Sequence, residues 1–158
     1  MMERSLVSTT RDVGDLVELS RLLVSVAYRS LATAHEPVQL PQFRALTVLA
    51  ESGPCTVGQL AEALDAHPST VTRLCDKVVA AGWVSRQNRP HNRREVEVDL
   101  TDSGRSLVHR VLSARAAELE RILARLPKAS RKALAQVLPE LLEAADHAVP
   151  QPREAWAI

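Results

Sequence analysis

The stretch Pro68-Ser-Thr-Val-Thr-Arg-Leu-Cys-Asp-Lys-Val-Val-Ala-Ala-Gly82 decides the fold of this chain. Its apolar residues recur at the i, i+3, i+4, i+7 spacing of one helical face, at Val71, Leu74, Cys75 and Val78. Pro68 suits the first helical position, where a missing N–H costs nothing, and Gly82 suits a left-handed stop after the last turn. The spacing therefore predicts an amphipathic helix with one buried face.

The opposite face of this helix is polar and basic. It carries Ser69, Thr70, Thr72, Arg73, Asp76 and Lys77. Most charged helix faces are simply solvated, but hydroxyls and cations near a helix N-terminus can also hydrogen-bond phosphates and reach base edges. This face alone leaves both interpretations open, and the neighbouring segments favour the second.

A shorter helix is predicted immediately before this one. The segment Thr56-Val-Gly-Gln59 has the pattern of a capping box, in which the glutamine reaches back to the cap residue. The inner face of the helix that follows consists of Val57, Leu60, Ala61 and Leu64. Only Asp65-Ala-His67 separates it from Pro68, so His67 is expected at the N-terminus of the second helix. Two short helices joined by about three residues, the second with a basic outer face, are typical of a helix-turn-helix.

After Gly82 the pattern changes from a helix to a pair of strands. Residues 83–87 can pair with residues 94–100, and the second run alternates acidic and apolar residues as Glu95, Val96, Glu97, Val98, Asp99 and Leu100. Residues 88–93 between the runs are too many for a tight turn and include cations. A helix-turn-helix followed by a basic hairpin predicts a winged helix, and the combination is more specific than either part.

Cations are concentrated in this part of the chain. The 158 residues carry a formal net charge of +1. Between Ala66 and Arg94, however, the only acid is Asp76, and the cations are Arg73, Lys77, Arg86, Arg89, Arg93 and Arg94. One basic segment inside a nearly neutral chain indicates a surface that contacts nucleic acid.

The composition indicates a globular, mainly helical protein. Hydrophobic residues make up 46% of the chain and aromatic residues only 3%, so the core must consist of Leu, Val and Ala. Cys55 and Cys75 form neither a disulfide framework nor a metal-ligand spacing, and we expect both thiols to be structural. We find no membrane span and no signal-peptide core, and we expect a cytoplasmic protein without a cofactor.

Long apolar helices are predicted on both sides of the winged helix. We divide the chain into a mobile N-terminus (1–9), an N-terminal dimerisation helix (10–35), a winged helix-turn-helix lobe (36–100), C-terminal dimerisation helices (101–148) and a tail (149–158). These helices are too apolar to serve only a small lobe, and a dimer interface is the simplest use for their surplus surface. For the first helix, burial in the core of its own chain remains the alternative.

The motifs resemble those of the MarR family of bacterial transcription regulators. The matching runs are residues 56–64, 68–73, 82–84 with Arg86, 92–94 and 100–104, in the order and spacing of the family. The resemblance is close from about Leu40 to Val108. It implies a mainly helical fold with a small β-hairpin wing, in which the first and the last two helices build a two-fold dimer.

The resemblance also implies which residues contact DNA. Those in or over the major groove would be Ser69, Thr70, Thr72, Arg73 and Lys77, and those of the wing would be Arg86, Arg89, Asn92, Arg93 and Arg94. In the family an arginine at the position of Arg94 enters the minor groove and is oriented by an aspartate, where this chain has Asn92. An amide can accept a hydrogen bond from Arg94 but supplies no charge, so we expect Arg94 to be less fixed.

The function implied is that of a sequence-specific regulator that binds double-stranded DNA. We expect a repressor that binds a pseudo-palindromic operator as a homodimer. The alternative is a winged-helix module that binds another protein and has no specific DNA site. We find no catalytic constellation and do not expect an enzyme.

Release by a small molecule is a further expectation from the resemblance. Some relatives hold small phenolic or other aromatic anions between the dimer helices and the DNA-binding lobe. Tyr28 and Arg44 could face such a cavity, although ordinary packing or exposure is the simpler expectation for each. Relatives that sense peroxide use a cysteine in the first helix, and this chain has no cysteine there. Some relatives bind zinc through histidines near the dimer junction, but we do not expect His35 and His109 to do so.

Overall fold

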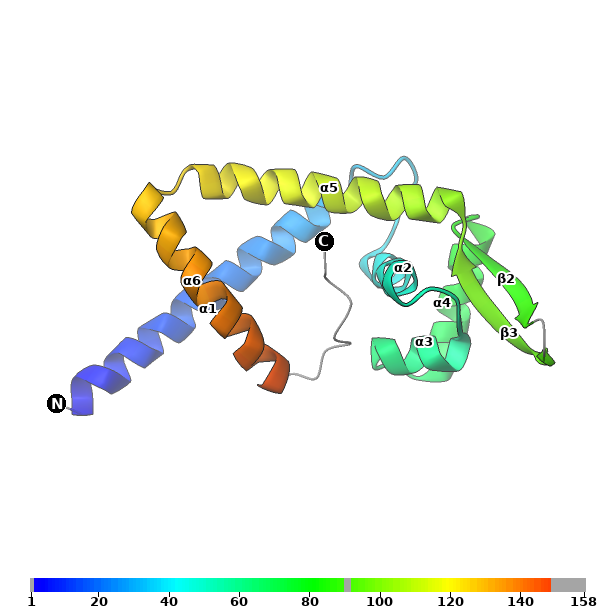
Figure 1. Ribbon diagram of the computed structural model, residues 1–158, viewed down its shortest axis with the longest axis horizontal. Coiled ribbons are helices and arrows are strands. Elements are labelled where there is room, and N and C mark those ends of the chain that lie inside the picture. The colour runs from blue at the N-terminus through cyan, green and yellow to red at the C-terminus, as the bar shows by residue number, and fades with distance from the viewer. Residues whose placement is uncertain (1, 90–91, 149–158) are drawn as a thin grey trace.

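The structure is a computed structural model that describes the backbone of residues 2–89 and 92–148 and the side chains of residues 11–87 and 96–145. Its elements are α1 (Met2–Leu31), α2 (Leu40–Ser52), β1 (Cys55–Thr56), α3 (Val57–Leu64), α4 (Pro68–Ala80), β2 (Val84–Arg89), β3 (Asn92–Leu100), α5 (Asp102–Ala124) and α6 (Lys128–Ala148). A lobe made of α2, α3, α4 and the sheet lies at one end, and α1, α5 and α6 extend away from it (Figure 1). The predicted fold class, mainly helical with a β-hairpin wing, is therefore confirmed.

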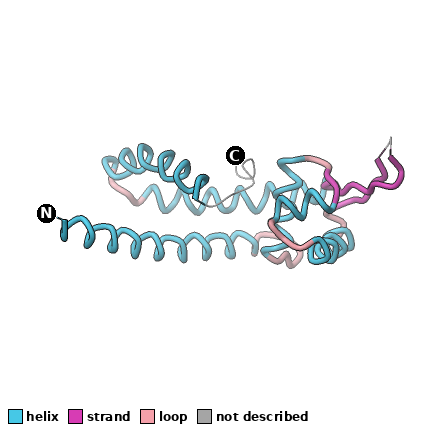
Figure 2. The backbone as a smooth tube through the Cα atoms, turned by 90° about the horizontal axis from the view of Figure 1, so that it is seen from below, coloured by secondary structure: helices cyan, strands magenta, loops and turns pink. Residues whose placement is uncertain are grey.

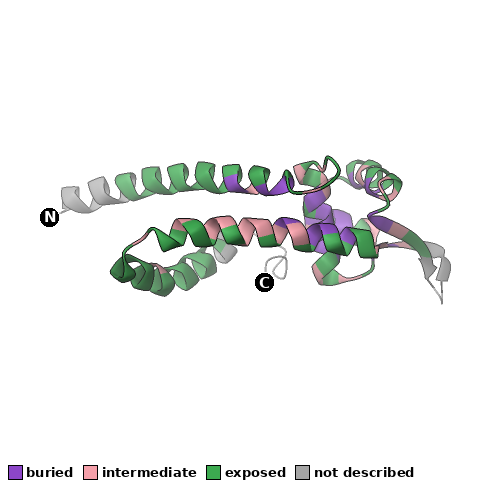
Figure 3. Cartoon of the chain, turned by 90° about the horizontal axis from the view of Figure 1, so that it is seen from above, coloured by how far each residue is buried: buried purple, intermediate pink, exposed green. Residues whose placement is uncertain are grey.

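The lobe holds the hydrophobic core. Its most deeply buried side chains come from four helices and one strand: Phe43, Leu46, Leu49, Leu60, Val71, Cys75, Val78, Val98 and Val111. The first turns of α5 complete this core, the rest of α5 is partly buried or exposed, and nearly all of α6 is exposed (Figure 3). Close packing of aliphatic side chains accounts for a core with so few aromatic residues.

The helix-turn-helix forms through the local signals that predicted it. Thr56 and Gln59 make a reciprocal capping box: the Gln59 backbone N–H donates to Thr56 Oγ1 at 3.2 Å, and the Thr56 N–H donates to Gln59 Oε1 at 2.9 Å. Asp65 ends α3 in the left-handed conformation, with φ of 49°. His67 then caps α4, and the chain turns sharply between the two helices.

The sheet has one strand more than the sequence predicted. Its order is β1-β3-β2, with both pairs antiparallel, so the predicted hairpin is confirmed and the two residues of β1 are added at its inner edge. Cys55 pairs with Val98, and Thr56 pairs with Glu97. A strand of two residues is too short to show an alternating pattern, and for this reason the sequence showed only the helix cap at Thr56, the second residue of the strand.

The apolar face of β3 is shorter than its alternation predicted. Val98 and Leu100 are buried, but Val96 is 41% exposed. β3 is covered by β1 only at its inner end, and beyond that point it pairs only with β2. The hairpin therefore projects past the core, and Figure 2 shows it extending from the lobe.

The first helix begins earlier than predicted. We expected a mobile segment over residues 1–9, but α1 already begins at Met2. Residues 2–9 contain no proline or glycine, so nothing in them stops the helix from extending toward the N-terminus. The predicted tail, residues 149–158, lies outside the described residues.

The extending helices expose a large apolar surface. Side chains of α1 and α6 that are 40% exposed or more include Val13, Leu16, Val17, Leu19, Leu22, Leu23, Val137, Leu138, Leu141 and Leu142. A single chain leaves them uncovered (Figure 3). Exposed apolar surface of this extent marks an interaction site. No helix within the described ranges is both long enough and apolar enough to span a membrane.

Candidate nucleic-acid interface

The two faces of α4 separate as the sequence predicted, except that Leu74 is only partly buried. The apolar residues Val71, Cys75 and Val78 are buried, with at most 1% of each residue exposed. The polar residues Ser69, Thr70, Thr72, Arg73, Asp76 and Lys77 are all exposed. The structure therefore brings every predicted major-groove residue onto one accessible surface.

Hydrogen bonds at the start of α4 fix its first turn. His67 Nδ1 accepts from the backbone N–H of Ser69 at 3.3 Å and lies 2.8 Å from the Ser69 hydroxyl oxygen. The Thr72 hydroxyl donates to the carbonyl oxygen of Pro68 at 2.9 Å. A hydroxyl that donates to its own helix keeps free lone pairs and can still accept a hydrogen bond from a ligand.

Arg86 is paired within the protein, which the sequence did not predict. Its Nη2 donates to Asp76 Oδ1 at 2.5 Å, so a side chain of β2 reaches back to α4. The expectation for Arg86 was a wing cation that contacts DNA. The available signal was the single acid among the cations of this segment, but the sequence could not show which cation it would bind.

The other wing residues are placed only by their backbone. Arg89 ends β2 and pairs with Asn92, and β3 continues through Arg93 and Arg94. The side chains of these four residues lie outside the described part of the structure. Contact between Asn92 and Arg94 therefore stays a prediction.

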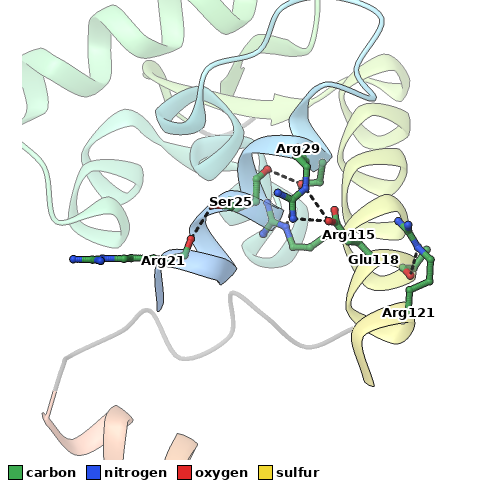
Figure 4. A network of polar contacts seen from close by, with 9 residues as sticks. Arg21, Ser25, Arg29, Arg115, Glu118 and Arg121 are labelled. Carbon is green, nitrogen blue, oxygen red and sulfur yellow. Dashed lines mark hydrogen bonds and ion pairs between the residues drawn. The ribbon is translucent and has the colours of Figure 1, made fainter. Parts of the chain in front are cut away.

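A polar network joins the long helices α1 and α5 (Figure 4). Arg29 of α1 and Glu118 of α5 form an ion pair at 2.5 Å, reinforced by a second hydrogen bond at 2.8 Å. One helical turn before Glu118, Arg115 Nε donates to the Ser30 hydroxyl at 3.3 Å. Burial lowers the pKa of Arg115, because a cation is less stable away from water. This network ties the last turn of α1 to the middle of α5.

A surface cavity of about 680 Å³ lies where α1 meets α2. Its lining includes Tyr28, Leu31, His35 and Leu40. Arg44 is exposed and does not line it, so the structure brings Tyr28 but not Arg44 to this cavity. His109 lines a separate depression on α5 rather than approaching His35.

The two cysteines are free and buried. Burial raises the pKa of both thiols. The neighbouring Cys75 raises the pKa of Cys55 further, whereas Arg86 partly opposes the increase at Cys75. Thiols with raised pKa values are poor nucleophiles. Within the described ranges, no cluster of three or more His, Cys, Asp and Glu residues could hold a metal ion.

Comparisons with known proteins agree with this geometry. The sequence model described as the MarR family matches residues 38–96. An HTH-type transcriptional regulator of Mycobacterium bovis is 34% identical over 128 residues, which are 80% of this chain and 87% of the relative. An HTH-type transcriptional repressor of Bacillus subtilis, MdtR, is 29% identical over 105 residues, which are 66% of this chain and 68% of the relative. The crystal structure of RV1404 from Mycobacterium tuberculosis superposes with a TM-score of 0.78 at 36% identity, covering 84% of this chain and 90% of the other.

Proposed function

This chain belongs to the MarR family of HTH-type transcriptional regulators, and from that premise we propose that it represses transcription by binding a pseudo-palindromic operator as a homodimer. The observation that carries the proposal is the exposed face of α4, where hydroxyls of the first turn are followed by Arg73 and Lys77. Arginine can bind guanine with two hydrogen bonds, and hydroxyls reach bases or phosphates. The proposed role for α4 is that of the recognition helix in the major groove.

The exposed apolar surface of α1 and α6 supports pairing of two chains. Helices that leave many leucines and valines in water are stabilised when a second copy covers them. A two-fold dimer would present two copies of α4 to successive major grooves, about 10–10.5 base pairs apart. The wing cations Arg89, Arg93 and Arg94 would then contact the backbone and the minor groove beside each recognition helix.

Repression is the proposed outcome of this binding. The relative from Bacillus subtilis is named a repressor, and a dimer seated on an operator can exclude polymerase from the same DNA. Release would need a ligand that binds the DNA-competent and the DNA-incompetent arrangements of the lobes unequally. For that ligand we propose a small aromatic anion in the cavity lined by Tyr28 and His35, which lies where α1 meets the lobe.

Genomic selection followed by salt titration tests the proposal. Duplex fragments retained by the full chain are sequenced, and the affinity for the recovered site is measured by fluorescence anisotropy at several salt concentrations. A log–log slope of several units is expected, since each phosphate contact releases counterions. Arg73→Ala should weaken binding by about 1–3 kcal/mol and relax the sequence preference. Arg21→Ala, on α1 away from the lobe, is the matched cationic control and should leave affinity unchanged.

Two results would reject parts of this function. Absence of salt-dependent duplex binding would favour the alternative, a winged-helix module that binds another protein. Salicylate serves as the probe for the cavity: it should lower the affinity of the wild-type protein for DNA, and Tyr28→Ala should reduce that effect. Equal DNA affinity with and without millimolar salicylate would reject effector release by this class of anion.

A further inference from the structure

The ion pair between Arg86 and Asp76 crosses from the wing to the recognition helix. Asp76 is the only acid in α4 and lies on the same exposed face as Arg73 and Lys77. Arg86 extends from β2, opposite the buried Val98 of β3. The two side chains are 39% and 56% exposed, so the pair lies at the surface and on the side of the lobe that carries the candidate interface.

The same two elements are also tied through their backbone. Gly82, with φ of 74°, turns the chain between α4 and β2, and the Trp83 N–H donates to the Val78 carbonyl oxygen at 3.0 Å. These contacts fix the point where the wing leaves α4, and the pairing of β1 with Val98 and Glu97 holds the base of β3. The pair between Arg86 and Asp76 adds a side-chain contact that joins β2 directly to α4, at the register of Val98.

We propose that Arg86 is a positioning residue, which through Asp76 sets the angle between the recognition helix and the wing, rather than a residue that contacts DNA phosphate. The inference rests on the proposed function, since it concerns how one lobe engages two grooves at once. A helix in the major groove and a wing at the minor groove bind together only when their relative angle matches the duplex. Holding that angle before binding lowers the conformational entropy lost in the complex.

Asp76 distinguishes this role from direct contact. An acid on a DNA-facing surface repels phosphate, and if Arg86 were a phosphate ligand, Asp76 would compete with DNA for it. Asp76→Asn would then strengthen DNA binding. If Arg86 instead positions the wing, Asp76→Asn weakens DNA binding even though it removes a negative charge. The two roles therefore predict opposite signs for the same substitution.

A double-mutant cycle on the full chain provides the test. We expect Asp76→Asn and Arg86→Gln each to weaken specific binding about two- to five-fold, the range of a surface ion pair. The double variant should match the single variants, because the second substitution has no interaction left to remove. Arg86→Gln should leave the salt slope of binding unchanged, whereas the loss of a phosphate contact lowers it by about 1.

Arg105→Gln is the matched control. Arg105 pairs with Asp99 at 3.0 Å, an ion pair that joins α5 to β3 rather than α4 to β2, and its loss should leave DNA affinity unchanged. Tighter binding by Asp76→Asn, additive losses in the double variant, or a reduced salt slope for Arg86→Gln would each overturn the positioning role. All three outcomes presuppose DNA binding by the wild-type protein, so they are distinguishable from failure of the proposed function itself.

Discussion

The guanidinium group of Arg115 lies over the ring of Phe43, with its central carbon 5.6 Å from the ring centroid. Phe43 is a core residue of α2, and Arg115 is on α5 at the end of its buried section. Arg115 Nη2 is buried without a hydrogen-bond partner among the described residues. The ring therefore helps to compensate the partial desolvation of this cation.

This contact predicts a measurable coupling between the two residues. The variants Phe43→Leu, Arg115→Met and their combination should give a coupling of about 0.5–1 kcal/mol in the free energy of unfolding. Urea denaturation measures all four proteins. Pairing Phe43→Leu with Arg121→Met should give no coupling, because Arg121 bonds only to the backbone of its own helix in the described contacts. Equal coupling in both cycles would show that the contact between Arg115 and the ring of Phe43 does not contribute to stability.

The sequence predicted those parts of the fold that depend on neighbouring residues. The capping box of Thr56 and Gln59, the left-handed Gly82 and the buried stripe of α4 each follow from residues a few positions apart. The strand at Cys55 could not be predicted in this way, because it exists only through its pairing with Val98. The exposure of Val96 likewise depends on where the core ends along β3, and the alternating sequence pattern of that strand carries no information about this position.

The same distinction between local and long-range contacts applies to the candidate site. Helical periodicity alone placed Ser69 and Arg73 on the exposed face of α4. The partner of Arg86 depends on how β2 packs against α4, so the sequence did not show that this residue, expected to bind DNA, pairs with Asp76. Arg115 was missed for the same reason: its neighbours come from α1 and α2, far away in sequence.

Substitution of Gly104 should destabilise the lobe. Thr101 caps α5 and also donates to the Gly82 carbonyl oxygen at 2.7 Å, which draws the first turn of α5 against the start of the wing. A Cβ atom at Gly104 would overlap the carbonyl oxygen of Trp83. We expect Gly104→Ala to cost about 1–3 kcal/mol of stability in thermal or urea unfolding.

Gly58→Ala is the control for that prediction. A Cβ atom at Gly58 meets only Thr56 Oγ1, at 3.8 Å, and φ is not in the left-handed region. Alanine favours a helix over glycine by about 0.5–1 kcal/mol, so this variant should be as stable as the wild type or slightly more stable. Equal destabilisation by both alanines would show that Gly104 is not sterically constrained.

Loss of the capping box should destabilise the helix-turn-helix. Thr56→Ala removes the acceptor for the Gln59 N–H and should cost about 0.5–2 kcal/mol. Thr56→Ser keeps the hydroxyl and should retain most of that stability. The urea midpoint should fall for the alanine variant while the slope stays constant, as expected when compactness does not change. A midpoint shared by Thr56→Ala and the wild type would contradict the role of the cap.

The buried thiols make stability sensitive to alkaline pH. An unfolded chain ionises Cys55 and Cys75 near the ordinary thiol pKa of about 8.5, whereas the folded chain keeps them protonated to higher pH. Their contribution to stability is therefore complete below that value and is lost as pH rises through the raised native pKa values. The double variant Cys55→Ser/Cys75→Ser should therefore lose less free energy of unfolding as the pH rises above that value.

Burial of the two thiols should also slow their chemical labelling. A thiol reagent at pH 8 should label the native protein only as fast as the protein opens, and immediate labelling of both thiols would refute their burial.

Dimerisation through the long helices should be abolished by one charge on α1. Leu16 is 45% exposed in the single chain, and covering it in an interface contributes about 0.7–1.4 kcal/mol, roughly half the value for a fully exposed leucine. Two-fold symmetry doubles the loss in Leu16→Glu, and the carboxylate adds the cost of burying a charge, so the dissociation constant should rise at least about 100-fold. Light scattering should give twice the 17.3 kDa chain mass for the wild type, but only the chain mass for Leu16→Glu. Glu62→Ala, an exposed substitution on α3, is the control and should also give twice the chain mass. Because one lobe holds only half of the proposed operator contacts, the monomeric variant should also lose specific DNA binding. A Leu16→Glu protein that remained a dimer would place the interface on another surface.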